Sequence, residues 1–361
     1  MTRIRVPLGK FIKEYSERNK GNEDIPVYSV TNSQGFCTEY FGKEVASQDK
    51  TTYKIVPQGY FAYNPSRINV GSVDWQRYEK RVIVSPLYNV FSVSEGIDRQ
   101  YLYYFLRSDL GRQMIKAKAS GSVRDNLKLD MLKEMTIPDI SVEQQKFCSS
   151  VLDKLHKLIQ MRQQELQKLD EFIKARFVEM FVKNEYDWKE VTIAEVCIDM
   201  RTGPFGSSLH HDEFVDKGVF VLGIDNAVEN TFSYNRMRYI TEEKYEKLKR
   251  YTVYPGDVII TIMGTVGKAV VIPKNMPKAI NTKHLACLTP NTEIVDSYFL
   301  VNAFQIHPLI RHQLESQCKG AIMDGLNLTI IKGLKFKLPP IKLQRKFVEF
   351  YNQVDKSKVV A

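Results

Sequence analysis

The sequence has few of the features that mark secreted, membrane-spanning or metal-binding proteins. Its five cysteines lie far apart and include no Cys-x-x-Cys pair, which argues against a disulfide framework and a zinc knuckle. The adjacent His210 and His211 lack the spacing of metal ligands. No apolar run approaches the roughly 18 residues of a transmembrane helix, and the first residues contain no signal-peptide core. We therefore expect a soluble, cytoplasmic protein without a membrane association, metal or cofactor.

Complete catalytic motifs are also absent. Residues 264–268 (GTVGK) lack the first Gly and the Ser or Thr of a phosphate-binding loop, because Ile262 and Ala269 occupy those positions. A β-hairpin with a basic tip is the simpler interpretation. Residues 64–67 (NPSR) lack the second Pro and the aromatic residue of the amino-methyltransferase motif. We therefore expect that the chain is not itself an enzyme.

Positive charge is present in excess and is unevenly distributed. Lys and Arg number 52 against 42 Asp and Glu, which gives a net charge of +10. Residues 1–140 carry 21 basic and 16 acidic side chains, whereas residues 184–340 carry 18 of each. A basic balance of this kind favours a polyanionic partner such as a nucleic acid.

The sequence repeats itself at an offset of about 200 residues. The matching segments, in order, are 57–62 with 253–259, 97–102 with 295–300, 121–133 with 320–332, 138–140 with 339–341, and 144–147 with 344–347. Several matches in the same order indicate a duplication. We therefore predict two similar domains of mixed helix and strand, an α/β (α+β) fold.

Each repeat contains recognisable strands and a helix. Residues 257–263 and 268–273 are rich in β-branched side chains and are bounded by Gly and Pro, which predicts two strands. Residues 98–118 carry apolar side chains at helical spacing. We place the domains at 1–140 and 184–340, with connecting helices at 141–183 and 341–361.

A long helix is predicted over residues 144–182, which contain neither Pro nor Gly. Its about 39 residues would span roughly 58 Å at 1.5 Å per residue, and Ser141 with Gln144 resembles a capping box. Its apolar stripe must be buried, and the final helix is the comparable partner within the chain. The predicted packing residues are Val151, Leu155, Leu158, Leu166, Leu169, Ile173 and Phe177 on the long helix, with Phe347, Phe350 and Tyr351 on the final helix.

Duplicated bodies that each end in a Leu-x-Leu…Pro-x-Ile…Gln-x-x-Phe segment and a helix resemble the specificity (S) subunit of type I restriction–modification systems. Residues 202–208 (TGPFGSS) and 254–261 (YPGDVIIT) also resemble this family. The likeness covers nearly the whole chain. The first body lacks the Gly-Pro-Phe-Gly segment, and the final helix is shorter than the first.

The resemblance implies a division of labour between this chain and its partners. Each body would be a target recognition domain for one half of a split, asymmetric sequence in double-stranded DNA. The two helices would pack antiparallel and set the spacer between the half-sites. Where the shorter final helix runs out, methyltransferase subunits would cover the remaining stripe of the long helix. Methyltransferase subunits, two in number, would bind AdoMet and methylate adenine, and separate motor (restriction) subunits would translocate and cleave DNA.

We predict that polar and basic side chains in matched loops contact DNA. In the first body these are Lys20, Asn64, Ser66, Arg67, Asn69 and Arg124, and in the second body Arg201, Ser207, Ser208, Lys268, Lys283 and His284. Two other classes of function remain open, namely a protein-binding assembly adaptor and a self-contained DNA methyltransferase or nuclease. An AdoMet-binding or nuclease assay on the isolated chain separates the enzyme from the other two.

Overall fold

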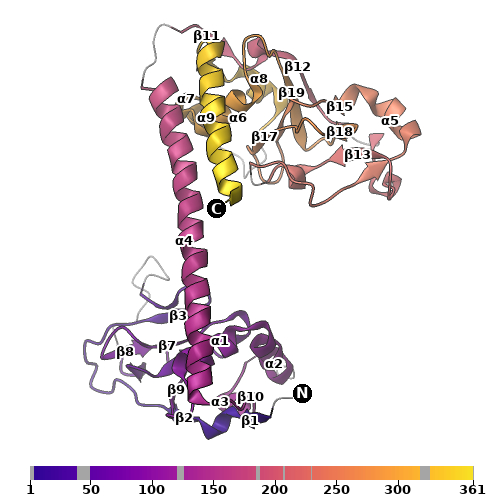
Figure 1. Cartoon of the computed structure of the whole chain (residues 1–361). Helices are drawn as coiled ribbons and strands as arrows, with labels where there is room; N and C mark the ends of the chain where they lie inside the picture. Colours follow the sequence, from indigo (N-terminus) through magenta and orange to yellow (C-terminus); the bar gives the residue numbers. More distant parts are fainter. Residues whose placement is uncertain are drawn as a thin grey trace. The chain divides into compact units, whose positions relative to one another are not determined.

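The computed structural model describes residues 4–38, 49–119, 126–183, 188–205, 208–228, 230–317 and 326–360. The chain forms two compact units, Met1–Gln160 (unit 1) and Met161–Ala361 (unit 2). Both units combine strands with helices (Figure 1). The predicted α/β (α+β) fold class is confirmed.

Each unit contains a four-stranded antiparallel sheet, and the two sheets have the same strand order. In unit 1 the order is β2 (Ile12–Tyr15), β9 (Asn89–Val93), β6 (Phe61–Tyr63) and β7 (Val73–Trp75). In unit 2 it is β12 (Cys197–Thr202), β19 (Leu285–Pro290), β16 (Val258–Thr261) and β17 (Ala269–Val271). This shared topology confirms the internal repeat.

A glycine in the same conformation precedes the central strand of each sheet. Gly59 and Gly256 have φ angles of 84° and 88°, a region that glycine occupies without steric cost. The Gly59 carbonyl accepts a hydrogen bond from Arg99 Nε at 2.9 Å, and the Gly256 carbonyl accepts one from Ser297 Oγ at 2.7 Å. Both donors are the first residues of the helices that follow. Each glycine therefore holds the start of the next helix at the same point of its sheet.

Two short helices follow each sheet. They are α1 (Arg99–Arg107) and α2 (Asp109–Ala119) in unit 1, and α6 (Ser297–Ile306) and α7 (Pro308–Gln317) in unit 2. The prediction of one helix over 98–118 is therefore wrong at Ser108. Ser108 is extended, and its Oγ accepts the N–H of Gly111 at 3.0 Å as an N-cap does. Pro308 enforces the corresponding break in unit 2, because it lacks a backbone N–H.

Further strands distinguish the two units. Unit 1 has two further antiparallel pairs, the hairpin of β3 (Ser29–Thr31) with β4 (Gly35–Cys37) and the pair of β5 (Lys54–Pro57) with β8 (Arg81–Val84). Unit 2 has a second four-stranded sheet, with the order β14 (Tyr239–Ile240), β13 (Val219–Leu222), β18 (Ala279–Asn281) and β15 (Thr252–Val253). A short antiparallel pair closes each unit, β1 (Arg5–Pro7) with β10 (Thr136–Pro138) and β11 (Glu190–Thr192) with β20 (Lys335–Lys337). A short helix precedes β10 and β20, namely α3 (Leu129–Lys133) and α8 (Leu328–Gly333).

A buried glutamine holds the end of each repeat to the start of its helix pair. Gln145 Oε1 accepts the N–H of Asp98 at 2.8 Å, and Gln344 Oε1 accepts the N–H of Asp296 at 2.9 Å. Each amide also donates to a backbone carbonyl near the end of its own closing segment, at 3.0 Å and 2.8 Å. Because both glutamines are buried, these bonds are shielded from water and specify the same turn twice.

These glutamines correct the sequence alignment by one residue. The alignment pairs Gln144 with Gln344 and Phe147 with Phe347, whereas the hydrogen bonds make Gln145 the counterpart of Gln344. As a result Phe147 is 70% exposed and Phe347 is fully buried. The two phenylalanines are therefore not equivalent.

The two connecting helices are observed as α4 (Val142–Phe181) and α9 (Ile341–Val360). The capping box that begins α4 is confirmed, since the N–H of Gln144 donates to Ser141 Oγ at 3.3 Å and the N–H of Ser141 donates to Gln144 Oε1 at 3.1 Å. The 40 residues of α4 begin in unit 1 and end in unit 2.

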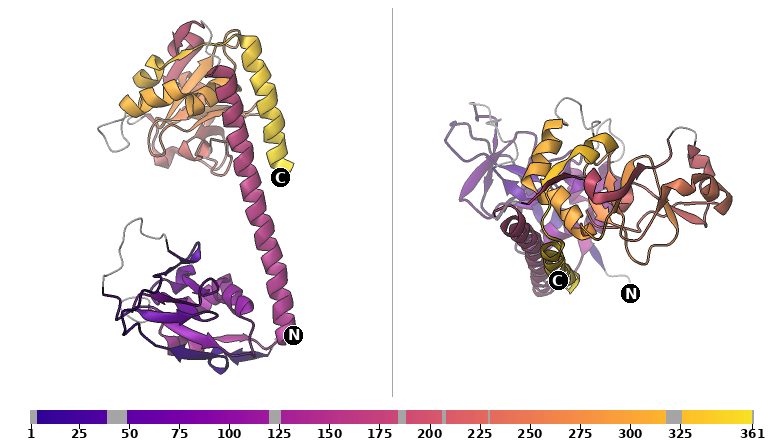
Figure 2. Two further views of the ribbon diagram at one scale, coloured as in Figure 1. Left: turned by 90° about the vertical axis from the view of Figure 1, so that its left-hand side faces the viewer. Right: turned by 90° about the horizontal axis from the view of Figure 1, so that it is seen from above.

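In unit 2 the end of α4 packs against α9 (Figures 1 and 2). The rings of Phe177 and Phe347 lie 5.4 Å apart, and Lys358 Nζ lies 2.6 Å from Asp170 Oδ1. Residue numbers fall along α4 as they rise along α9, so the two helices are antiparallel, as the resemblance implied. They share one apolar cluster with the central sheet of unit 2. That cluster includes the predicted packing residues Leu169, Ile173, Phe177, Phe347, Phe350 and Tyr351.

The N-terminal part of the predicted stripe is not covered within the chain. Leu155 is 50% exposed, and its neighbours on the stripe are similarly exposed; the exposed set is Val151, Leu155, Leu158 and Leu166. The final helix therefore packs against only the C-terminal part of the stripe, and cover of the remainder by methyltransferase subunits stays a prediction. Because Lys358, near the end of α9, already lies beside Asp170, α9 does not reach these residues.

Candidate nucleic-acid interface

In unit 2, loops that follow several strands meet at one end of the sheet formed by β12, β19, β16 and β17. The N–H of Ile262, directly after β16, donates to the carbonyl of His284 at 2.9 Å. The N–H of Thr282 donates to the carbonyl of Leu222, the last residue of β13, at 3.0 Å. The loops after β13, β16 and β18 therefore adjoin one another. We call residues 203–205, 208–211, 223–226, 262–268 and 282–284 the unit 2 loop edge.

A close backbone contact brings the loop after β12 to the same edge. A Cβ atom at Gly203 would lie 2.2 Å from the carbonyl oxygen of Asn281, so only glycine fits there. Gly203 belongs to the Gly-Pro-Phe-Gly segment noted in the sequence, and this contact explains its first glycine. Ser208 is exposed in the same loop, and Ser207 lies outside the described residues.

The predicted basic hairpin is confirmed between β16 and β17. These strands pair antiparallel, and Gly264 and Gly267 have φ angles of 70° and 83°. Thr261 Oγ accepts the N–H of Lys268 at 2.9 Å, which fixes the base of the turn. Lys268 is half-buried. In the described residues no carboxylate pairs with its ammonium, so its charge is available to an anion at the loop edge.

Lys283 and His284 lie on the adjoining connection between β18 and β19. Lys283 is exposed and His284 is half-buried. Burial lowers the pKa of His284, and the nearby positive charges of Lys283, Arg238 and His211 lower it further. His284 is therefore mainly neutral at pH 7, where its ring offers one hydrogen-bond donor and one acceptor.

Arg201 departs from its predicted role. Its guanidinium donates to Asp257 Oδ2 at 2.9 Å and to Asp199 Oδ2 at 2.6 Å, and its side chain is only 14% exposed. It also donates to Thr289 Oγ1 at 3.1 Å and to the carbonyl of Thr252. These bonds use most of its donors inside the sheet. Arg201 therefore stabilises unit 2, and we remove it from the proposed DNA-contacting set.

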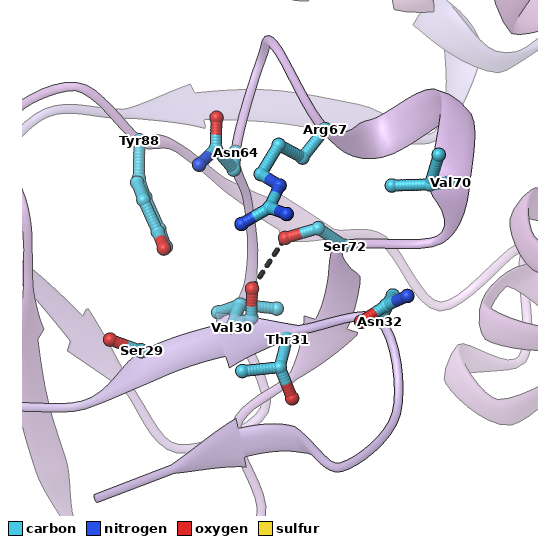
Figure 3. Close-up of a pocket in the computed structure, with 9 residues that line it drawn as sticks. All are labelled: Ser29, Val30, Thr31, Asn32, Asn64, Arg67, Val70, Ser72 and Tyr88. Atoms are coloured by element: carbon cyan, nitrogen blue, oxygen red, sulfur yellow. Dashed lines mark hydrogen bonds between the residues drawn. The ribbon is translucent and has the colours of Figure 1, made fainter. Parts of the chain in front are cut away.

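In unit 1, the predicted residues after β6 line a small polar pocket of about 90 Å³ (Figure 3). Asn64 and Arg67 face it from the loop between β6 and β7, and Asn64 Oδ1 accepts bonds from the N–H and hydroxyl of Ser66 at 3.1 and 2.9 Å. The remaining lining comes from Ser29, Val30, Thr31, Asn32, Val70, Ser72 and Tyr88. None of these residues is acidic, which suits an anionic or base-edge ligand.

The other predicted residues of unit 1 lie elsewhere. Asn69 is half-buried in the turn that follows Arg67. Lys20 is exposed in a separate loop, where the buried Asn19 accepts the N–H of Glu23 at 2.9 Å. Arg124 lies outside the described residues. The structure thus brings Asn64, Ser66, Arg67 and Asn69 together, but Lys20 belongs to another loop.

Sequence reasoning missed the hairpin β3–β4, which contributes four residues to this pocket. Its signal was present, because residues 31–35 (TNSQG) form a cluster of turn-favouring residues between apolar ones. Sequence reasoning also gave no role to Tyr88, which follows β8 and belongs to no motif. Both segments lie close to Asn64 only after folding.

The described residues contain no group of three or more His, Cys, Asp or Glu side chains that could hold a metal ion. None of the helices in those residues is both long enough and apolar enough to cross a membrane. The two units thus share one sheet topology and differ in the loops at its edge.

Comparisons with known proteins identify the family. The family model described as "Type I restriction modification DNA specificity domain" matches residues 9–171 and again residues 185–359. The MjaVIII type I restriction enzyme specificity subunit of Methanocaldococcus jannaschii is 21% identical over 97% of this chain and 85% of its own length. The EcoBI specificity subunit of Escherichia coli is 20% identical over 95% of this chain and 76% of its own length.

Solved structures show the same fold. A chain from a type I R-M system solved to show complex assembly and conformational transition matches with a TM-score of 0.59 and 16% identity, covering 100% of this chain and 92% of that one. The S subunit from M. genitalium matches with a TM-score of 0.56 and 15% identity, covering 99% and 90%. Because the family model matches both units, this chain belongs to the type I restriction modification DNA specificity domain family.

Proposed function

We propose that this chain is the DNA-recognition subunit of a type I restriction–modification complex, in which each unit reads one part of a bipartite, asymmetric target. The observation that carries the proposal is one frame used twice with different loop edges. Different loops are what two different half-sites require. Membership of the specificity family supports the same conclusion.

The chain contributes recognition, and other subunits contribute the chemistry. Methyltransferase subunits, two per chain, bind AdoMet and methylate adenine, and motor subunits translocate and cleave DNA. The loop edges offer amides, hydroxyls and cations suited to phosphates and base edges. The polar pocket of unit 1 has the same character.

Helix α4 sets the spacer between the half-sites and docks the methyltransferase subunits. It is continuous over 40 residues, and a continuous helix is a stiff connector. The exposed apolar side chains Val151, Leu155, Leu158 and Leu166 form the docking face. An apolar row of this length favours a protein partner over water.

DNA contacts divide between backbone and base edges. Lys268 and Lys283 bind phosphates, because ammonium groups on exposed loops supply charge without sequence preference. Asn64, Arg67 and the neutral His284 face base edges. Lys20, Ser66, Asn69, Arg124, Ser207 and Ser208 complete the proposed set.

The decisive experiment is co-purification of the chain with its methyltransferase subunit, followed by sequencing of methylated adenines in DNA exposed to the complex. We expect a stable complex and one bipartite methylated sequence. A triple Ala variant of Arg67, Lys268 and Lys283 should assemble normally but methylate that sequence far less efficiently. Parent-like methylation by this variant would remove these residues from the interface, and no sequence-specific methylation by the parent would overturn the proposal itself.

A further inference from the structure

The hairpin β3–β4 of unit 1 presents uncommitted amide side chains at its tip. Residues 32–34 (NSQ) connect the two strands and are exposed. In the described part of the chain, the side-chain amides of Asn32 and Gln34 make no hydrogen bond. Each amide therefore retains both a donor and an acceptor for an external partner.

The tip is held firmly from behind. The carboxylate of Asp74, whose side chain is 2% exposed, accepts the N–H of Phe36 at 3.1 Å. Arg107 donates to the carbonyl of Asn32 at 2.6 Å. Thr31 Oγ1 accepts the N–H of Gln34 at 3.0 Å. A tip whose backbone is fixed at three points holds these amides on an ordered chain, so that binding orders the two side chains but little further backbone.

The hairpin also lies beside the residues already proposed to contact DNA. Ser72 Oγ donates to the carbonyl of Val30, and Asn32 lines the same pocket as Asn64 and Arg67 (Figure 3). Arg107 joins the two segments, because it also donates to the carbonyl of Gly71 at 3.0 Å. Asn32 and the loop after β6 therefore form one surface, and Gln34, on the same turn, lines a neighbouring pocket with Tyr28 and Tyr78.

We propose that the β3–β4 hairpin is the base-reading element of unit 1, with Asn32 and Gln34 specifying adenine in its half-site. This inference rests on the proposed function. A two-stranded ribbon fits the major groove of B-DNA. There the amide NH₂ of Asn or Gln donates to adenine N7 while its carbonyl accepts from N6, the pairing that distinguishes adenine from the other bases. Arg67, beside the tip, is placed to face the same DNA segment.

In unit 2 the next strand, β14, also pairs antiparallel with β13, but residues 223–238 connect the two strands in place of the three-residue turn of unit 1. There β13 pairs in parallel with β18 and continues into a short turn over Ile224–Asn226, in which Asn226 is buried. Its side chain is already bonded to the N–H of Gly223 and the carbonyl of Ser233, at 2.8 and 2.7 Å. Asn226 is therefore not available to a base in the way proposed for Asn32, and the half-site of unit 2 serves as an internal control.

The test uses the full chain in complex with its methyltransferase subunit and a set of duplexes in which each base pair of the methylated target is varied. The double variant Asn32→Ala, Gln34→Ala should lose about 10- to 100-fold of its preference for A·T at one or two positions of one half-site. Discrimination in the other half-site should not change. Gln58→Ala is the matched control, because Gln58 is an exposed amide that precedes β6, whereas the pocket adjoins the end of β6.

A second variant keeps the shape of the tip and changes its chemistry. Gln34→Glu can accept but not donate hydrogen bonds, so it should shift preference at its position from A·T toward a cytosine, whose N4 donates. Unchanged discrimination in both half-sites, or an equal loss in both, would overturn the hairpin proposal. Failure of the parent complex to methylate any specific sequence would instead overturn the proposed function.

Discussion

The two units share a frame but fill one position in it with different chemistry. The common glycine turn makes Tyr60 the counterpart of Asp257, and the strand pairing makes Tyr15 the counterpart of Arg201. In unit 1 the rings of Tyr15 and Tyr60 meet edge to face, with centroids 5.0 Å apart. In unit 2 the guanidinium of Arg201 lies 2.9 Å from Asp257. An aromatic pair in one unit thus replaces an ion pair in the other.

This exchange shows that the frame constrains pairs of residues more than single ones. A tyrosine opposite Asp257, or an arginine opposite Tyr60, would leave a charge without its partner inside the sheet. The repeat therefore keeps its topology while its residues change in matched sets. What stays the same is the backbone junction, where Gln145 and Gln344 make the same bonds.

The largest expected effect comes from exchanging the part of unit 1 that precedes α4. Replacing residues 1–140 with the corresponding segment of a relative should change one half of the methylated sequence completely and leave the other half intact. The physical reason is that, in each unit, the loops proposed to contact DNA connect strands of that unit alone. Sequencing of methylated adenines measures the outcome, and a change in both half-sites would show that the units do not read independently.

A second comparison contrasts the two ends of α4. Phe177 is fully buried, so Phe177→Ala should reduce the free energy of unfolding of unit 2 by about 3–5 kcal/mol. Leu155 is 50% exposed, so Leu155→Ala should change it by less than about 0.5 kcal/mol. Calorimetry of the isolated chain measures both values.

For binding of the methyltransferase subunit we expect the exposed leucines of α4 to matter more than they do for stability. Leu155→Ala and Leu166→Ala should weaken co-purification with the methyltransferase subunit although both leave the chain folded. The matched control is Gln163→Ala, an exposed position on the same helix without an apolar side chain. Undiminished assembly of both leucine variants would show that this part of α4 is not the docking face.

A third comparison breaks the ion pair and the aromatic pair separately. Asp257→Ala leaves the guanidinium of Arg201 in the sheet with only Asp199 beside it and should destabilise unit 2 by about 3 kcal/mol. Tyr60→Leu keeps an apolar side chain and loses only the edge contact, so it should cost unit 1 about 0.5–1.5 kcal/mol. Denaturant unfolding of each variant measures the difference, and equal losses would contradict the comparison.

Sequence reasoning predicted the features that depend on local pattern. The duplication, the two strands around residues 264–268, the capping box at Ser141 and the long helix α4 all follow from spacing and residue type. The break at Ser108 was missed because a helical apolar pattern continues across it, while the N-cap that begins α2 is a single hydroxyl.

Features that depend on long-range contacts could not be predicted in the same way. Arg201 looked like a loop residue, but Asp257, its partner, is distant in the sequence and comes beside it only through β19. The one-residue error that paired Phe147 with Phe347 arose because adjacent glutamines, Gln144 and Gln145, offer two registers, and only the hydrogen bond to Asp98 separates them.

The smallest expected effect concerns the cations of the unit 2 loop edge. If Lys268 binds a phosphate, Lys268→Ala should weaken DNA binding to a similar degree on specific and non-specific sequences. It should also reduce the slope of log K against log salt by about one unit.

Lys274→Ala is the matched control, because Lys274 is exposed at the other end of β17 and should leave the slope unchanged. Titrations of the full complex at several salt concentrations measure both slopes. Because residues 184–340 carry 18 basic and 18 acidic side chains while residues 1–140 carry a net positive charge, the affinity of this part of unit 2 for DNA depends on where its unpaired lysines lie. Equal slopes for the parent and both variants would show that Lys268 does not contact the DNA backbone.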